Sequence, residues 1–138
     1  YPVSKTKLQK PIRDSNFYLI YKNDKIFLIQ NPANGIWGGL WSLLSAAEDD
    51  HKVIKPLLTS SKELKNLRFQ SSIKHTFSHF HLRLHVWAIS VTKEKPHANG
   101  RWFSLEEAQF IGLSRPIQRI IQSYQQKLAD GCAHATEK

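Results

Sequence analysis

Hydrophobic and polar residues alternate in two neighbouring segments near the middle of the chain. One segment covers residues 67–76 and the other residues 80–88. A period of two is typical of strands with one buried face. Because only a few residues separate the segments, the pattern predicts a β-hairpin with Phe77, Ser78 and His79 at or near an exposed tip.

Shorter apolar runs predict the remaining strands. Residues 17–21 and 26–29 are continuous β-prone runs around a polar turn, which predicts a central hairpin buried on both faces. Residues 40–44 and 101–103 predict short strands. Residues 53–58 predict a short or irregular helix, because Pro56 interrupts it, with the acidic residues 48–50 at its N-terminus. Residues 59–66 and 92–100 predict loops.

Two helices are expected near the C-terminus. Ser104 and Glu107 form a capping-box pattern. Pro116 suits the first turn of a second helix, whose apolar stripe faces the core. The order of elements favours an α+β fold, a mixed β-sheet with flanking helices. We expect a basic linker at residues 1–13, one domain at 14–129 and a disordered tail at 130–138.

The charge balance points to a polyanionic partner. Lys and Arg number 20 against 11 Asp and Glu, a net charge of +9, which suits a nucleic-acid binder, although basic domains also use charge for solubility. Cys132 is the single cysteine, so no disulfide framework exists and a reducing compartment is expected. No apolar run has the length of a membrane span. The lack of any methionine suggests a piece of a longer protein.

The predicted hairpin tip carries the candidate chemistry. Phe77 and Ser78 offer an aromatic ring and a hydroxyl that both donates and accepts, which can lie beside a stacked base and contact its edge. The flanking side chains are candidate phosphate contacts: Lys74, His75, His81 and Arg83. The alternative is a polar hairpin whose Phe77 folds back onto the core. Trp41 is expected in the core, and the role of Trp37 stays open.

Two segments resemble one known family. Residues 75–82, His-Thr-Phe-Ser-His-Phe-His-Leu, and residues 31–41, Asn-Pro-Ala-Asn-Gly-Ile-Trp-Gly-Gly-Leu-Trp, resemble the C-terminal domain of adenine DNA glycosylases of the MutY type. The resemblance covers roughly residues 14–127 and implies a nudix-like fold. It also implies that the linker at 1–13 arrives from an N-terminal catalytic domain, and that this part of the protein has no catalytic residues.

The resemblance assigns roles at the tip. It implies that Phe77 wedges beside a mispair of 8-oxoguanine with adenine, that Ser78 hydrogen-bonds the oxidised guanine, and that His79 helps place the loop against duplex DNA. The partners implied are this damaged duplex and the catalytic domain of the same protein. The whole protein would carry a 4Fe–4S cluster in its catalytic part, with no cofactor in the present chain. It would act as a monomer on the nucleoid in a bacterial cytoplasm.

Three other functions would account for parts of the sequence. A nudix hydrolase needs a helix of the pattern Arg-Glu-x-x-Glu-Glu to hold magnesium, and the chain contains no such pattern. The clustered histidines suggest zinc, but no Cys, Asp or Glu lies between Asn66 and Thr92, so we expect no metal. A protein-interaction module, with the tail and linker holding a partner such as a replication clamp, remains an alternative.

Overall fold

The computed structural model describes residues 10–46, 51–97 and 100–137. The strands are β1 (Ile12–Lys22), β2 (Lys25–Gln30), β3 (Trp41–Ser42), β4 (Leu44–Ala46), β5 (Arg68–Thr76), β6 (His81–Ser90) and β7 (Gly100–Ser104). The helices are the two 3₁₀ segments η1 (Lys52–Leu57) and η2 (Ser61–Asn66), and the α-helices α2 (Leu105–Ala108) and α3 (Arg115–Glu137). This content confirms the α+β prediction.

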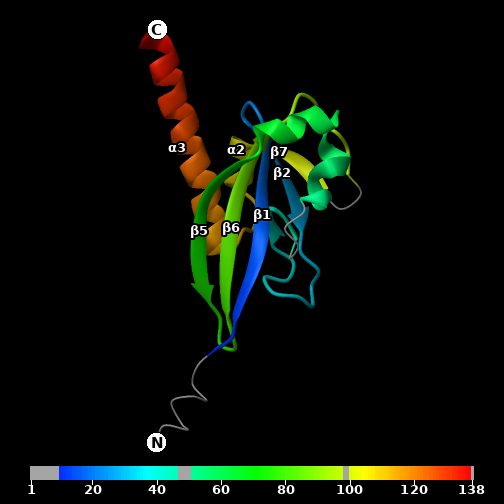
Figure 1. Cartoon of the computed structure of the whole chain (residues 1–138). Coiled ribbons are helices and arrows are strands. Elements are labelled where there is room, and N and C mark those ends of the chain that lie inside the picture. Colours follow the sequence, from blue (N-terminus) through cyan, green and yellow to red (C-terminus); the bar gives the residue numbers. More distant parts are fainter. Residues whose placement is uncertain (1–9, 47–50, 98–99, 138) are drawn as a thin grey trace, which may run out of the picture.

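The described strands form a single mixed sheet. Its order is β3-β2-β1-β6-β5, with β4 also paired to β1 and β7 to β2. The central pair, β1 and β6, is parallel from Ile12 opposite His81 to Tyr21 opposite Ser90, whereas the other strand pairs are antiparallel. Both predicted hairpins are confirmed, and β1 lies at the centre of the sheet as expected (Figure 1).

The two faces of the sheet bury separate apolar clusters. Alternate residues of β1 divide between them, because successive strand side chains point to opposite faces. Phe17 and Leu19 pack with the first turns of α3, through Ile117, Ile120 and Ile121. Tyr18 and Ile20 pack with η1 on the other face, through Ile54 and Leu57. The helices in Figure 1 lie on either side of the sheet accordingly.

The helix starts were predicted well. The capping box is present, since Ser104 Oγ accepts from the Glu107 amide and the Glu107 carboxylate accepts from the Ser104 amide. The second helix begins at Arg115 with Pro116 in its first turn. The segment at 53–58 is short and contains Pro56, as expected. The acidic residues 48–50 lie outside the described residues.

Several boundaries differ from the predictions. Residues 61–66 form η2 instead of a loop, because a buried Glu63 attaches this segment to the domain. Strand β1 begins at Ile12, inside the expected linker, since residues 12 and 13 continue the ladder with β6. Helix α3 continues to Glu137 through the expected disordered tail, where the segment contains no proline and two alanines, which favour helix.

The alternation in β5 breaks at a bulge. The register with β6 shifts between Phe69 and Ser71. Phe69 therefore contacts Trp87, with ring centroids 5.2 Å apart, and is 52% exposed. Ile73 lies on the opposite face, against the cluster that packs with α3. An unbroken period of two would have put Phe69 and Ile73 on the same face. Because of the bulge, the Phe69 ring lies on the opposite face from Ile73.

Glu63 joins η2 to the loop that follows β6. Its carboxylate accepts hydrogen bonds from the backbone amide of Thr59 and, at 2.8 Å, from that of Thr92, whose hydroxyl donates at 3.1 Å. Burial alone would raise the pKa of Glu63, but these hydrogen bonds outweigh it and hold the pKa below its ordinary value. The ionised form is therefore the one that stabilises the fold.

Replacing Glu63 with Gln should destabilise the domain at neutral pH by about 1–3 kcal/mol, because an amide cannot accept from both backbone amides and leaves a donor unsatisfied. Since folding lowers the pKa, the contribution of Glu63 is present above the unfolded-state pKa and disappears as the pH falls through the folded-state pKa. Urea unfolding from pH 7 to pH 3 should show the difference between Glu63→Gln and the parent chain shrinking on acidification.

The matched control is Glu94→Gln. Glu94 makes exposed ion pairs with Lys22 at 3.7 Å and Lys25 at 3.4 Å, and exposed ion pairs contribute about 0–1 kcal/mol. An equal loss of stability in both variants would show that Glu63 contributes only as a surface charge.

A candidate nucleic-acid interface at the hairpin tip

The turn between β5 and β6 presents two polar side chains to solvent. The Phe77 amide donates to the Phe80 carbonyl at 2.8 Å, which closes the turn. Ser78 and His79 lie between these residues, and both are exposed. The prediction of an exposed tip is confirmed for Ser78 and His79.

The ring of Phe77 does not share this exposure. It is half-buried and stacks on Phe80, with centroids 4.7 Å apart and an interplanar angle of 22°. The rings of His75 and Trp37 complete its surroundings, at 4.8 and 5.5 Å. The alternative in which Phe77 folds back onto the core therefore describes its position, and the prediction of exposure is wrong for this side chain.

The Trp37 side chain comes from a hydrogen-bonded loop between β2 and β3. The Asn31 amide donates to the Leu40 carbonyl at 2.9 Å, and the Leu40 amide donates to the Trp37 carbonyl at 3.0 Å. A side chain on Gly38 would lie 2.3 Å from the Ala33 carbonyl oxygen, so only glycine fits there. The loop therefore presents Trp37 in a defined position.

The backbone of Trp37 is itself strained. Its φ of 53° lies in the left-handed region, which costs a residue with a side chain roughly 1–2 kcal/mol. Such a conformation persists only where surrounding contacts determine it. Here the Trp37 ring lies 6.5 Å from Phe17 in the core and 5.6 Å from His75 on the hairpin. Trp41 packs 4.9 Å from Phe103, as expected for a core residue.

Cationic side chains from the N-terminal segment lie beside the tip. Lys10 Nζ donates to the Phe77 carbonyl at 3.0 Å, and the Arg13 guanidinium lies 4.4 Å from the Phe80 ring centroid. Lys74 projects from β5, directly opposite Arg83 on β6. Partial burial, followed by the nearby charges of Lys74 and Lys10, lowers the pKa of His81, which favours its neutral form. The tip therefore has an electropositive border.

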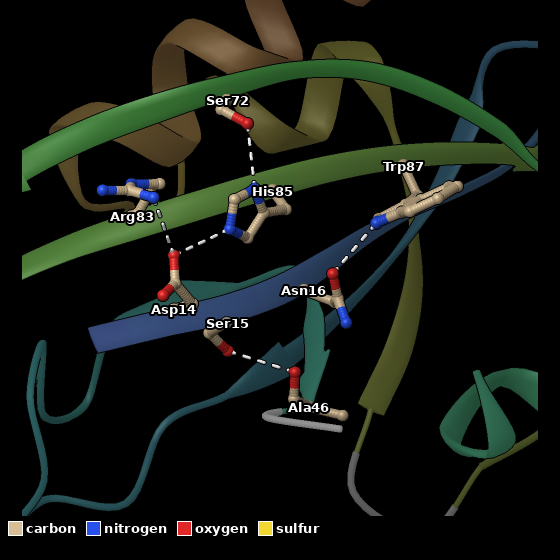
Figure 2. A network of polar contacts seen from close by, with 8 residues as sticks. All are labelled: Asp14, Ser15, Asn16, Ala46, Ser72, Arg83, His85 and Trp87. Carbon is tan, nitrogen blue, oxygen red and sulfur yellow. Dashed lines mark hydrogen bonds and ion pairs between the residues drawn. The ribbon is translucent and has the colours of Figure 1, made fainter. Parts of the chain in front are cut away.

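A polar network covers the sheet face that continues from this border. In Figure 2, Asp14 on β1 lies beside two side chains of β6: its carboxylate is 2.9 Å from His85 Nε2 and 3.6 Å from the Arg83 guanidinium. His85 Nδ1 in turn lies 2.9 Å from Ser72 Oγ on β5. Farther along the same strands, Trp87 Nε1 donates to Asn16 at 3.0 Å. Asp14 thus offsets part of the positive charge of this face.

The structure brings together most of the residues that the sequence singled out. Lys74, His81 and Arg83 share one face of the hairpin, next to Ser78 and His79. His75 does not join them, because it lies on the other face and contacts Trp37 and Phe77.

Lys10, Arg13 and Asp14 were missed. Two of them fell in the expected linker, and no local pattern pairs that segment with a strand some 70 residues later.

The histidines do not converge. His81 Nδ1 lies 2.9 Å from Thr76 Oγ1, His85 contacts Ser72 and Asp14, and His75 faces the aromatic rings. Among the residues described, no three His, Cys, Asp or Glu side chains gather as metal ligands.

No helix within the described ranges has both the length and the apolar character needed to cross a membrane.

A protein-family model described as a NUDIX domain matches residues 16–123. The chain belongs to the NUDIX domain family. This assignment confirms the nudix-like fold expected from the two sequence segments. In this NUDIX domain, the segment between β4 and β5 contains η1 and η2, and the chain carries no Arg-Glu-x-x-Glu-Glu pattern there or elsewhere.

Curated relatives of this NUDIX domain include two adenine DNA glycosylases. The protein of Buchnera aphidicola subsp. Acyrthosiphon pisum is 25% identical over 132 residues, which cover 93% of this chain and 37% of that protein. The human protein is 25% identical over 120 residues, which cover 78% of this chain and 22% of that protein. The chain therefore spans well under half the length of both relatives.

Solved structures share the fold. The C-terminal domain of mouse MUTYH, crystallised in complex with human PCNA, has a TM-score of 0.62 at 17% identity, covering 83% of this chain and 88% of that one. The NUDIX domain of Shewanella oneidensis NrtR, crystallised with ADP ribose, has a TM-score of 0.63 at 13% identity, covering 88% and 92%. Together with the glycosylase relatives, these matches support a domain like the C-terminal domain of MutY-type proteins.

The charges beside His81 can be tested directly. Replacing Lys74 with Gln removes one of the positive charges that lower the pKa of His81, so the pKa should rise toward its ordinary value. The measurement is an NMR titration of the imidazole ring C–H signals. Lys93→Gln, in the loop after the other end of β6, should leave the pKa unchanged. An unchanged pKa in Lys74→Gln would mean that burial and Lys10 account for the shift.

Proposed function

We propose that this NUDIX domain is the lesion-recognition domain of an adenine DNA glycosylase, and that its hairpin tip contacts 8-oxoguanine paired with adenine in duplex DNA. The observation that supports this most directly is the exposed pair Ser78 and His79, bordered by Lys10, Lys74 and Arg83 on the described surface. The relatives are named adenine DNA glycosylases, which supports DNA as the substrate class.

The side chains at the tip suit this role. Oxidation converts N7 of guanine from an acceptor into a donor and adds an oxygen at C8. The hydroxyl of Ser78 can accept from that donor, and Phe77 is the apolar ring that would wedge beside the pair. Because a hydroxyl rotates to donate to ordinary guanine as well, Ser78 should contribute only modest discrimination, within the roughly 1–3 kcal/mol of a good base contact.

Phosphate contacts would come from the electropositive border. Lys74 and Arg83 are neighbours across the hairpin, and Lys10 contacts the Phe77 carbonyl at the turn. His81 would gain positive charge beside a phosphate, because an adjacent anion raises the pKa of an imidazole. Arg83 must loosen its pair with Asp14 to contribute fully. Lys74 is therefore the clearest phosphate contact to test.

Catalysis would belong to the N-terminal domain of the same protein. A 4Fe–4S cluster requires four ligands, usually cysteine thiolates, and the chain has one cysteine, Cys132. The residues present do not fit the cluster, so it would be held by the catalytic domain. We expect the whole protein to work as a monomer with the nucleoid in a bacterial cytoplasm.

A second candidate partner is a replication clamp. Phe110 follows α2 and is 83% exposed, and its sequence neighbour Ile111 lines a groove together with Leu113 and Ile121. The MUTYH domain with the same fold was crystallised with PCNA. Phe110→Ala should weaken capture by an immobilised bacterial clamp without changing DNA affinity. Equal binding of the clamp by the parent chain and by Phe110→Ala would show that Phe110 does not contact the clamp.

The proposal is tested by titrating the chain with two duplexes that differ only in 8-oxoguanine or guanine opposite adenine. Amide shifts should cluster at residues 76–81 and be larger for the damaged duplex. Ser78→Ala should reduce the preference for the damaged duplex by about 1 kcal/mol or more. Ser123→Ala, an exposed serine on α3, is the control. Equal losses on both duplexes would show that Ser78 only positions the turn.

The phosphate contacts can be tested separately through the salt dependence of DNA binding. Lys74→Glu should weaken binding to both duplexes alike and reduce the slope of log affinity against log salt by about one or more, because one phosphate contact is lost and a repulsion added. Fluorescence anisotropy between 50 and 200 mM salt measures this slope. Lys93→Glu is the charge-matched control. A loss confined to the damaged duplex would contradict a phosphate role for Lys74.

A further inference from the structure

In the described structure the Phe77 ring packs against its neighbours and does not extend into solvent as Ser78 and His79 do. The ring is half-buried among Phe80, His75 and Trp37, whereas the adjacent Ser78 and His79 are exposed. A wedge beside a mispair must project from the protein surface. The position seen in the structure and the position that the proposed function requires are therefore different.

The backbone of Phe77 can stay in place while its ring moves. The amide and the carbonyl of Phe77 are both occupied, by Phe80 and by Lys10 Nζ. Rotation about the side-chain bonds breaks neither hydrogen bond. The change between the two positions is therefore local to one side chain, and the turn that carries Ser78 keeps its shape.

Trp37 differs from the other neighbours of the ring. Among the ring contacts of Phe77 in the described residues, those to His75 and Phe80 come from the hairpin itself, and the contact to Trp37 comes from outside it. Trp37 belongs to a hydrogen-bonded loop, and its ring packs near Phe17 in the core. Its left-handed backbone conformation is held at a position where an unstrained glycine would otherwise be favoured.

We infer that Trp37 is a positioning residue that holds the Phe77 ring in its half-buried position, which we call the stored position. The packing of Trp37 on Phe77 then sets the free-energy cost of releasing the ring as a wedge when the tip binds duplex DNA. The inference rests on the proposed function. If only the released ring is competent to bind, the apparent affinity is reduced by the fraction released. This cost is the same for damaged and undamaged duplexes, so Trp37 controls overall affinity, whereas Ser78 contributes to the preference.

The first measurement uses the free protein. In Trp37→Ala, nuclear Overhauser effects between the rings of Phe77 and His75 should weaken, and three-bond couplings should show a new χ1 population for Phe77. Alanine keeps the same non-glycine backbone strain at position 37, so the comparison isolates the ring. Trp41→Ala removes a half-buried tryptophan that packs on Phe103 and is the matched control; it should leave Phe77 unchanged.

The second measurement is affinity for the two duplexes. Trp37→Ala should bind both more tightly by the same factor, about two- to ten-fold, which is the range expected for loss of one aromatic pair. In the background of Phe77→Ala, adding Trp37→Ala should change nothing. Trp37→Phe keeps a smaller ring, so it should increase affinity for both duplexes by a smaller factor. It replaces the alanine variant if that variant folds poorly.

The outcomes separate the two ideas. An unchanged Phe77 rotamer in both Trp37 variants overturns the stored position. A shifted rotamer without any gain in affinity supports storage by Trp37 and contradicts the wedge in the proposed function. Tighter binding that persists after Phe77→Ala overturns the inference, because Trp37 would then act on DNA binding by another route.

Discussion

The parallel pairing of β1 with β6 is the constraint on which the candidate site depends. It joins ten residue pairs between strands some 70 positions apart, at the centre of the sheet. The ladder starts next to the hairpin tip, where the His81 amide donates to the Pro11 carbonyl at 2.9 Å. Because that end is fixed, Lys10 reaches the Phe77 carbonyl and Arg13 lies over Phe80. The tip is thus built from two distant parts of the chain.

The same pairing explains why one face of the sheet is apolar at one end and charged at the other. Toward the far end of β1, Tyr18 and Ile20 are covered by η1 and belong to the apolar core. Toward the tip, Asp14 occupies the equivalent face and meets Arg83 and His85. A change from apolar to ionic contacts along one strand indicates where the covering helices end. The polar end of this face therefore remains available for a charged ligand, while Asp14 limits its net charge.

Local sequence patterns predicted the strands and helices well, but they predicted the tertiary contacts between these elements poorly. The capping box at Ser104 and the hairpin at residues 77–79 depend on neighbours in sequence, so alternation and capping preferences sufficed. The bulge at Phe69 and the left-handed Trp37 arise from tertiary packing, which no short window contains. The exposed serine and histidine of the tip were predicted, whereas the burial of Phe77 and the approach of Lys10 required the distant strand and loop.

The stored ring also bears on why such a tip stays folded without its ligand. An exposed phenylalanine next to exposed Ser78 would leave apolar surface in water, a cost that packing against Trp37 and Phe80 removes. The close backbone approach at Gly38 and the hydrogen bonds of the loop at residues 31–40 support that packing. If the proposed function holds, a tip that rests with its apolar ring covered and its polar groups exposed would meet DNA as a hydrophilic, electropositive surface. Contact with a base pair would then require a partner that offsets the free energy of uncovering Phe77, and a pair that is already easy to unstack would offset it most readily.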